Sequence, residues 1–216
     1  ASDRGKADPA MSEQQQPRTL LVVDDHELVR VGLRQVIAQR FADRFHVEEA
    51  HSLEQALSFL EGRADEVFLL LLDLNLGDAR GLSGLKLLGR LYPRLRVAIV
   101  SGTHDARVRE EALAHGALGY FCKTGDTRDL SGLLDTIERA AAPGAAGPGA
   151  ARGAGLPSVP LNNRQIQVLE LLLSGLDNRA IAAETGLALG SVKNCVSAIF
   201  LSFNVRSRAE LIGRFS

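Results

Sequence analysis

The sequence contains no tryptophan, only two cysteines and no long apolar run, and each shortage excludes a class of protein. Cys122 and Cys195 are too few for a disulfide scaffold or a structural zinc site, and they fit a reducing compartment. No apolar stretch approaches the roughly 20 residues that a membrane-spanning helix needs. The polar stretch 1–18 lacks the apolar centre of a secretion signal. We therefore expect a cytoplasmic protein with no membrane contact.

An excess of charge of one sign is also lacking, because the net charge of the 216 residues is −1. The chain is 45% hydrophobic and 24% charged, which is typical of globular proteins and excludes general disorder. Contact with nucleic acid would have to come from a local patch. The charge is unevenly divided, since residues 18–139 carry a net charge of −3 and residues 157–216 carry +2.

Alanine, glycine and proline dominate residues 140–157, where Arg152 is the only charged residue. Glycine and proline recur too often for a helix to persist, so this segment is predicted to be a flexible linker. The length allows two domains. We expect a leader or cloning remnant at 1–17, one domain at 18–139, the linker, and a second domain at 158–216.

Five short apolar runs alternate with amphipathic segments in the first domain. The predicted strands are residues 20–23, 45–50, 67–72, 97–100 and 118–122. Strands that are apolar throughout and separated by helices indicate a parallel sheet covered on both faces. Ligands of such sheets bind beyond the carboxyl ends of the strands.

Charged and polar residues follow four of these predicted strands. Asp24 and Asp25 follow the first, Asp73 the third, Ser101 the fourth and Lys123 the fifth. All should converge at one edge of the sheet, where three crowded carboxylates need counter-charges to stay ionised. Mg²⁺ and a lysine can supply them, and the same charges suit a transferring phosphoryl group.

With Tyr120 three positions before Lys123, residues 18–139 resemble the receiver domain of a two-component response regulator. The resemblance implies an α/β, flavodoxin-like fold with a five-stranded parallel sheet of order 2-1-3-4-5. It implies a phosphoryl group received from a sensor histidine kinase, and no turnover of a substrate. Ser101 and Tyr120 would form the switch pair, and Lys123 would stabilise the phosphoryl group.

The resemblance also implies roles for the acidic residues. Asp73 would be the phospho-acceptor. Asp25, Asp73 and the backbone carbonyl of Asn75 would bind Mg²⁺ directly, and Asp24 would act mainly through water. Gly77 departs from the family, which usually has proline four residues after the acceptor.

Individual residues of this group could instead have purely structural roles. An aspartate after a strand often caps a helix, and Asp25 is expected to cap the next helix as well. His26 is expected at the surface or at the edge of the cleft. Cys122 is expected to be a small buried hydrophobe.

The second domain contains no strand pattern and is predicted to be all-α with four helices. The first ends at Gly175, the second is capped by Asn178 and ends at Gly186, the third starts at Ser191, and the last spans 209–215. Two helices joined by a tight glycine turn indicate a helix-turn-helix, whose second helix can enter the major groove of DNA.

This domain resembles the LuxR-type helix-turn-helix domain, which is the output domain of response regulators of the NarL/FixJ class. The resemblance rests on Leu161, Arg164, Val168, Leu169, Gly175, Asn178, Ile181, Ala182, Val192, Lys193, Val205, Ser207 and Arg208. The chain departs from the family at Asn162-Asn163 (usually Thr-Pro), Gln165 (usually Glu) and Cys195 (usually His).

The predicted recognition helix is poor in charge, since Lys193 is its only cation. The expected DNA-contacting residues are Ser191, Lys193, Asn194, Ser197, Arg206 and Arg208. Arg164 and Arg179 either contribute or are simply solvated. Phe203 and Leu211 either form a dimer surface or belong to the core.

Two functions are weighed on this basis. The first is a phosphorylation-dependent regulator of transcription that binds double-stranded DNA and forms a homodimer on activation. The alternative is a receiver-controlled protein-interaction module with weak or lost DNA binding, suggested by the charge-poor helix. A metal-dependent phosphatase is disfavoured, because no second catalytic acid is evident near Asp73.

Overall fold

The computed structural model describes residues 17–124, 127–140 and 161–215. Nearly all of the predicted leader and linker lies outside these ranges, so their boundaries stay predictions. The N-terminal elements are β1 (Arg18–Val23), α1 (Glu27–Phe41), β2 (Phe45–Ala50), α2 (Leu53–Leu60), η1 (Ala64–Glu66), β3 (Val67–Asp73), α3 (Ser83–Leu91), β4 (Val97–Ser101), α4 (Ala106–Ala114), β5 (Tyr120–Cys122) and α5 (Thr127–Ala140).

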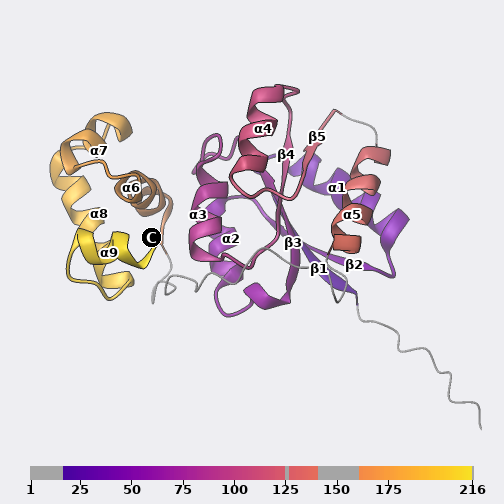
Figure 1. Ribbon diagram of the computed structural model, residues 1–216, viewed down its shortest axis with the longest axis horizontal. Coiled ribbons are helices and arrows are strands. Elements are labelled where there is room, and N and C mark those ends of the chain that lie inside the picture. Colours follow the sequence, from indigo (N-terminus) through magenta and orange to yellow (C-terminus); the bar gives the residue numbers. More distant parts are fainter. Residues whose placement is uncertain (1–16, 125–126, 141–160, 216) are drawn as a thin grey trace, which may run out of the picture.

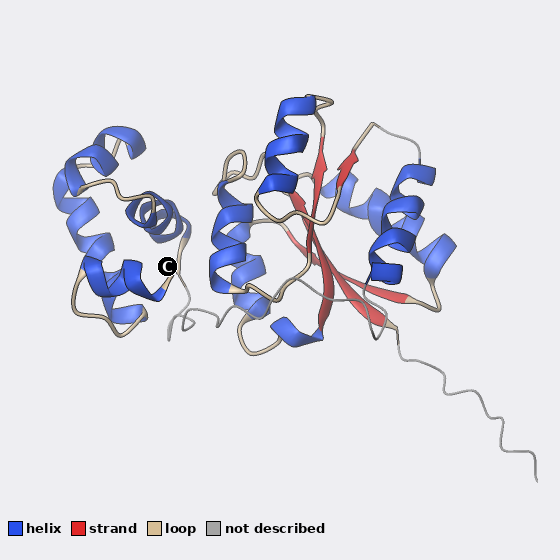
Figure 2. Cartoon of the chain, in the orientation of Figure 1, coloured by secondary structure: helices blue, strands red, loops and turns tan. Residues whose placement is uncertain are grey.

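The five strands form one parallel sheet of order β2-β1-β3-β4-β5, which confirms the predicted fold (Figure 2). Strand β3 is buried at all 7 of its positions because it lies inside the sheet with helices on both faces. This burial explains why its sequence is an unbroken apolar run rather than an alternating one.

Alternate residues of each strand point to opposite faces of the sheet. Leu21 and Val23 of β1 belong to a core cluster with α2, α3 and α4, while Leu20 and Val22 pack with α1 and α5. Figure 1 shows α2, α3 and α4 on one face of the sheet and α1 and α5 on the other. The helices therefore cover the two faces, and the carboxyl ends of the strands stay available for a site.

Four helices form the C-terminal domain: α6 (Asn163–Leu173), α7 (Asn178–Thr185), α8 (Leu189–Ser202) and α9 (Arg208–Arg214). Helices α7 and α8 meet at 113°, within the range of a helix-turn-helix. The turn between them passes through Gly186, whose φ of 69° is a left-handed conformation that glycine adopts at no steric cost.

Two predicted helix starts are wrong by one or two residues. The N-cap of α7 is Asp177, whose carboxylate accepts the N–H groups of Arg179 and Ala180, and Asn178 is already helical. Helix α8 begins at Leu189 rather than at Ser191, and its N-cap side chain makes no hydrogen bond.

Among the described residues, no single helix has the length and apolar character needed to span a membrane, although α7 and α8 reach that limit together as a bent pair.

Candidate functional site

The predicted site residues of the first domain meet at the carboxyl ends of the strands. Asp24 and Asp73 are 1% and 2% exposed, and Ser101 at the end of β4 is fully buried. Asp25 lies at the exposed rim beside them. The convergence expected from a parallel sheet is therefore present, and it buries two carboxylates side by side.

Lys123 is the cation of this cleft. Its Nζ lies 2.7 Å from Asp24 Oδ2 and 2.9 Å from Asp73 Oδ2. Burial alone would lower the pKa of Lys123, but its hydrogen bonds to the two carboxylates and their charges raise that pKa above its ordinary value. The lysine thus stays charged and ties the ends of β1, β3 and β5 together.

One ammonium does not balance the cleft. Asp73 Oδ1 is buried without a hydrogen-bond or ion-pair partner among the described residues, and Asp24, Asp25 and Asp73 bring three carboxylates to one place. A buried, unpartnered carboxylate oxygen is costly unless a cation or a donor reaches it. The arrangement therefore suits a divalent cation bound through oxygen ligands.

The predicted switch pair, Ser101 and Tyr120, meets at Thr103. The Thr103 N–H donates to Ser101 Oγ at 3.3 Å, and the Tyr120 hydroxyl donates to the Thr103 carbonyl at 2.9 Å. The two side chains are therefore linked through the backbone of one shared residue.

The loop after Asp73 contains a residue that the sequence pattern did not single out. Asp78 is 3% exposed, and its carboxylate accepts the N–H groups of Leu53 at 3.1 Å and Glu54 at 2.8 Å, at the start of α2. Asn75, the predicted metal-binding position, lies exposed at the rim of this loop. No local signal could reveal Asp78, because the helix that it caps precedes it by 25 residues.

Two plainer expectations are wrong. The N-cap of α1 is His26 rather than Asp25, and no side chain caps this helix. Asp25 instead places its Oδ1 2.6 Å from His26 Nδ1. Cys122 is only half-buried, and its Sγ contacts the side chains of His104 and Thr124, each at 3.2 Å. The thiol is therefore in a polar environment at the end of β5.

Some of the predicted DNA-contacting side chains are exposed to solvent, and others are held by contacts within the domain. Lys193, Asn194 and Ser197 are exposed on α8, and Arg206 is exposed before α9. Ser191 is half-buried.

Arg208 departs from the prediction, because its guanidinium donates to the Leu176 carbonyl and to Asn178 Oδ1. It braces the turn before α7 from the start of α9. Phe203 and Leu211 are 1% and 0% exposed, so they are core residues and not a dimer surface.

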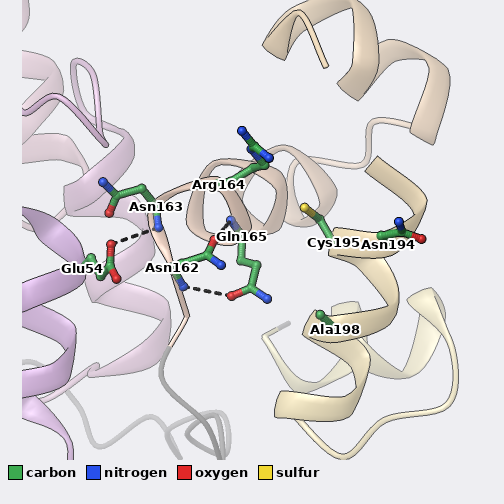
Figure 3. Close-up of a pocket in the computed structure, with 8 residues that line it drawn as sticks. All are labelled: Glu54, Asn162, Asn163, Arg164, Gln165, Asn194, Cys195 and Ala198. Atoms are coloured by element: carbon green, nitrogen blue, oxygen red, sulfur yellow. Dashed lines mark hydrogen bonds between the residues drawn. The ribbon is translucent and has the colours of Figure 1, made fainter. Parts of the chain in front are cut away.

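The start of α6 explains the unusual Asn162, Asn163 and Gln165. Asn162 Oδ1 accepts the Gln165 N–H at 3.0 Å, and Gln165 Oε1 accepts the Asn162 N–H at 2.9 Å, which forms a complete capping box. The Asn163 N–H donates to Glu54 Oε2 of α2 at 3.2 Å and so joins the two domains (Figure 3). Asn194 lines the groove at this contact.

Glu170 of α6 is a half-buried acid. Burial raises the pKa of Glu170, and Ser83, Lys86 and Arg90 of α3 oppose this rise. The surroundings of Glu170 therefore include polar groups of the receiver domain. The larger apolar cluster also contains residues of both domains.

Both domains match known families. Residues 20–135 match the response regulator receiver domain, and residues 159–215 match the luxR family of bacterial regulatory proteins. This chain belongs to the response regulators. Its receiver and LuxR-type domains make it a phosphorylation-dependent regulator of transcription.

Relatives of this response regulator align with it over most of their own length. The glycerol metabolism activator of Pseudomonas putida is 32% identical over 206 residues, which cover 89% of this chain and 92% of that protein. The nitrate/nitrite response regulator NarL of Escherichia coli strain K12 is 30% identical over 208 residues, with 91% and 94% covered.

Solved structures agree on the fold of this regulator. An RcsB–DNA complex matches with a TM-score of 0.51 at 17% identity and covers 92% of this chain and 97% of that one. A CheX–CheY complex with BeF₃ and Mg²⁺ from Borrelia burgdorferi matches with a TM-score of 0.52 at 19% identity, covering 56% and 90%.

Proposed function

We propose that Asp73 is the residue at which this regulator receives the phosphoryl group, from a sensor histidine kinase. The observation that supports this role is the unpartnered Asp73 Oδ1 at the buried carboxyl end of the central strand β3. The Asp73 carboxylate would attack the phosphorus atom of the kinase's phosphohistidine, and the P–N bond would break as the new P–O bond forms, with Lys123 2.9 Å from Asp73 Oδ2. The lysine and the Ser101 hydroxyl are placed to stabilise the oxygens of the transferred group.

The residues fit Mg²⁺, because the cleft holds three carboxylates against one lysine and leaves the buried Asp73 Oδ1 without a donor among the described residues. Asp25, Asp73 and the Asn75 carbonyl would bind the ion directly, with Asp24 acting through water. When bound, Mg²⁺ neutralises charge on the phosphoryl oxygens. The relative from Borrelia burgdorferi that contains Mg²⁺ supports this assignment through its shared receiver fold.

The chain itself does not turn over a substrate in this proposal. Phosphorylation draws the Ser101 hydroxyl towards the phosphoryl group and moves Tyr120 through Thr103. Such a switch needs the phosphoryl group to favour one of two states by a few kcal/mol. The change would favour a homodimer, in the cytoplasm, where the kinase domain and DNA are both accessible.

Double-stranded DNA is the proposed target of the C-terminal domain. Lys193, Asn194 and Ser197 are exposed on the second helix of the helix-turn-helix, and Arg206 is exposed in the turn that follows this helix. Arg179 lines the same hollow as Lys193. With so few cations in each monomer, binding should be weak until a dimer doubles the number of phosphate contacts.

The deciding experiment is the intact mass of the protein after acetyl phosphate, with and without Mg²⁺, for the natural chain and Asp73→Asn. We expect a Mg²⁺-dependent gain of one phosphoryl group that Asp73→Asn abolishes while the fold is retained. Full labelling of the Asn variant would refute the assignment of Asp73. If phosphorylated protein bound no duplex DNA even at low salt, the protein-interaction function would replace DNA binding.

A further inference from the structure

The imidazole of His26 lies at the metal side of the cleft. Its Nδ1 is 2.6 Å from Asp25 Oδ1 and 3.3 Å from Asp24 Oδ1. The His26 backbone N–H also donates to Asp24 Oδ1 at 2.9 Å, which holds residue 26 against the acidic pair. One ligand atom from each of Asp24, Asp25, His26 and Asp73 can be chosen so that all lie within 4.8 Å of one another.

These spacings match a coordination sphere. Two adjacent ligands of a metal with bonds of about 2.1 Å lie about 3 Å apart, and opposite ligands lie about 4.2 Å apart. His26 Nδ1 lies 2.6 Å from Asp25 Oδ1 and 3.3 Å from Asp24 Oδ1, which are distances close to the separation of two adjacent ligands. A second observation points to the same position, because Asp73 Oδ1 is buried there and has no cation or hydrogen-bond donor beside it among the described residues.

Nothing else in the local structure requires an imidazole at position 26. His26 is the N-cap of α1, but its side chain makes no capping hydrogen bond, and 65% of the side chain is exposed. The remaining contacts of the ring are those with Asp25 and Asp24, in which Nδ1–H can donate to a carboxylate. The ring nitrogen therefore has two possible partners, a carboxylate oxygen or a metal ion bound beside it.

We infer that His26 Nδ1 is an additional ligand of the divalent ion, and that this receiver prefers Mn²⁺ to Mg²⁺. The inference rests on the proposed function, because it assumes a cation among Asp24, Asp25 and Asp73. Mn²⁺ shares the preference of Mg²⁺ for oxygen ligands, but as a transition ion it exchanges a water for an imidazole more readily than Mg²⁺, which retains its waters. Replacing one water by nitrogen should therefore strengthen Mn²⁺ binding and leave Mg²⁺ binding nearly unaffected.

The test compares the full chain with His26→Gln, which removes the imidazole and keeps the backbone N–H that bonds to Asp24. His46→Gln is the matched control, since His46 is also an exposed histidine beside a carboxylate, 3.3 Å from Glu48 on β2. Mn²⁺ and Mg²⁺ are titrated calorimetrically into each protein, and pulsed electron paramagnetic resonance of the Mn²⁺ complexes reports ¹⁴N coupling to the ion.

We expect the natural chain and His46→Gln to bind Mn²⁺ more tightly than Mg²⁺ and to show ¹⁴N coupling. His26→Gln should lose the coupling and bind Mn²⁺ about tenfold more weakly, with Mg²⁺ affinity changed less than about twofold. Absence of ¹⁴N coupling in the natural chain, no binding of Mn²⁺, or unchanged Mn²⁺ affinity in His26→Gln would overturn the inference. Labelling by acetyl phosphate with Mg²⁺ separates the outcomes, because it persists if only the role of His26 fails and is absent if the proposed phosphoryl site fails.

Discussion

The acidic cleft and the exposed face of α8 are built in opposite ways. In the cleft, five polar side chains come from the ends of four different strands, and two of the carboxylates are buried against one lysine. On α8, the three exposed polar side chains come from a single helix, and only one of them is charged. The cleft therefore depends on how the sheet assembles, whereas the helix depends on which few side chains project from it.

This difference teaches how each region should respond to substitution. A change in the cleft alters several interacting charges at low solvent exposure, so its effect should be large and cooperative. A change on α8 adds or removes one solvated contact, so its effect should be small and additive. The predictions below test this contrast, from the largest expected effect to the smallest.

Lys123→Ala should slow labelling by acetyl phosphate about 100-fold, because it removes the cation that faces Asp73 and the transferred oxygens. The rate is measured by the time course of intact mass at fixed Mg²⁺. Lys193→Ala, a lysine variant in the other domain, is the control and should label at the natural rate. A loss of less than about fivefold in Lys123→Ala would contradict the proposed role.

Arg208→Ala should lower the free energy of unfolding of the C-terminal domain by about 1–3 kcal/mol, because it removes hydrogen bonds to Leu176 and Asn178. Urea denaturation measures the loss. Arg206→Ala provides the contrast, since this side chain is exposed, and it should change DNA affinity rather than stability. Equal stability of the two variants would show that Arg208 does not brace the domain.

Lys193→Ala should reduce the slope of log affinity against log salt by about one unit per monomer, since it removes one phosphate contact. Ser197→Lys should increase the slope by a similar amount, because it adds a cation to the same exposed face. Binding to one duplex at several salt concentrations gives both slopes. If neither variant moved the slope, the exposed face of α8 would not be the DNA-binding surface.

Glu170→Gln should raise the stability of the full chain at pH 7 by less than about 1 kcal/mol. Burial raises the pKa of Glu170, so the folded protein favours the protonated acid, and this contribution is lost as pH rises through the folded pKa. The gain should disappear below the ordinary value of 4.5. Melting temperatures at pH 7 and below pH 4.5 measure the gain in stability. The control is Glu184→Gln, at an exposed position, whose melting temperature should equal that of the natural chain at each pH.

The sheet and its cleft could be predicted because they depend on simple periodic rules. Apolar runs identified the strands, and parallel geometry required Asp73, Ser101 and Lys123 to meet at one edge. The order β2-β1-β3-β4-β5 was predicted from the resemblance to receivers. The roles of the individual side chains stay proposals, since the fold brings them together without showing the chemistry.

Contacts between distant segments could not be predicted. Asp78 caps a helix that lies 25 residues earlier, and Arg208 bonds to a carbonyl 32 residues earlier, so neither leaves a local pattern. Phe203 and Leu211 posed a related problem, because an apolar residue near a chain end has the same sequence signature in a core and in an interface. Only the packing of α9 places both of them inside.

The predicted starts of α7 and α8 were wrong for a local reason. Asp177 and Asn178 are both good capping residues, and the extended backbone of Asp177 decides between them. At α8 no side chain caps the helix, so the sequence has no capping signal before Leu189, and the start predicted at Ser191 is two residues late.

The contact at Asn163 predicts an unusual constraint on sequence variation. Position 163 is the first residue of α6, where proline is favoured because its missing N–H would find no partner within the helix. In this chain the same N–H reaches Glu54 of the receiver. The side-chain amide of Asn163, oriented with its nitrogen towards the receiver, also donates to Glu54 and to Asp78 Oδ2. A library selected for contact between the domains would therefore favour asparagine at position 163 and reject proline, the residue that is most favourable to the helix alone.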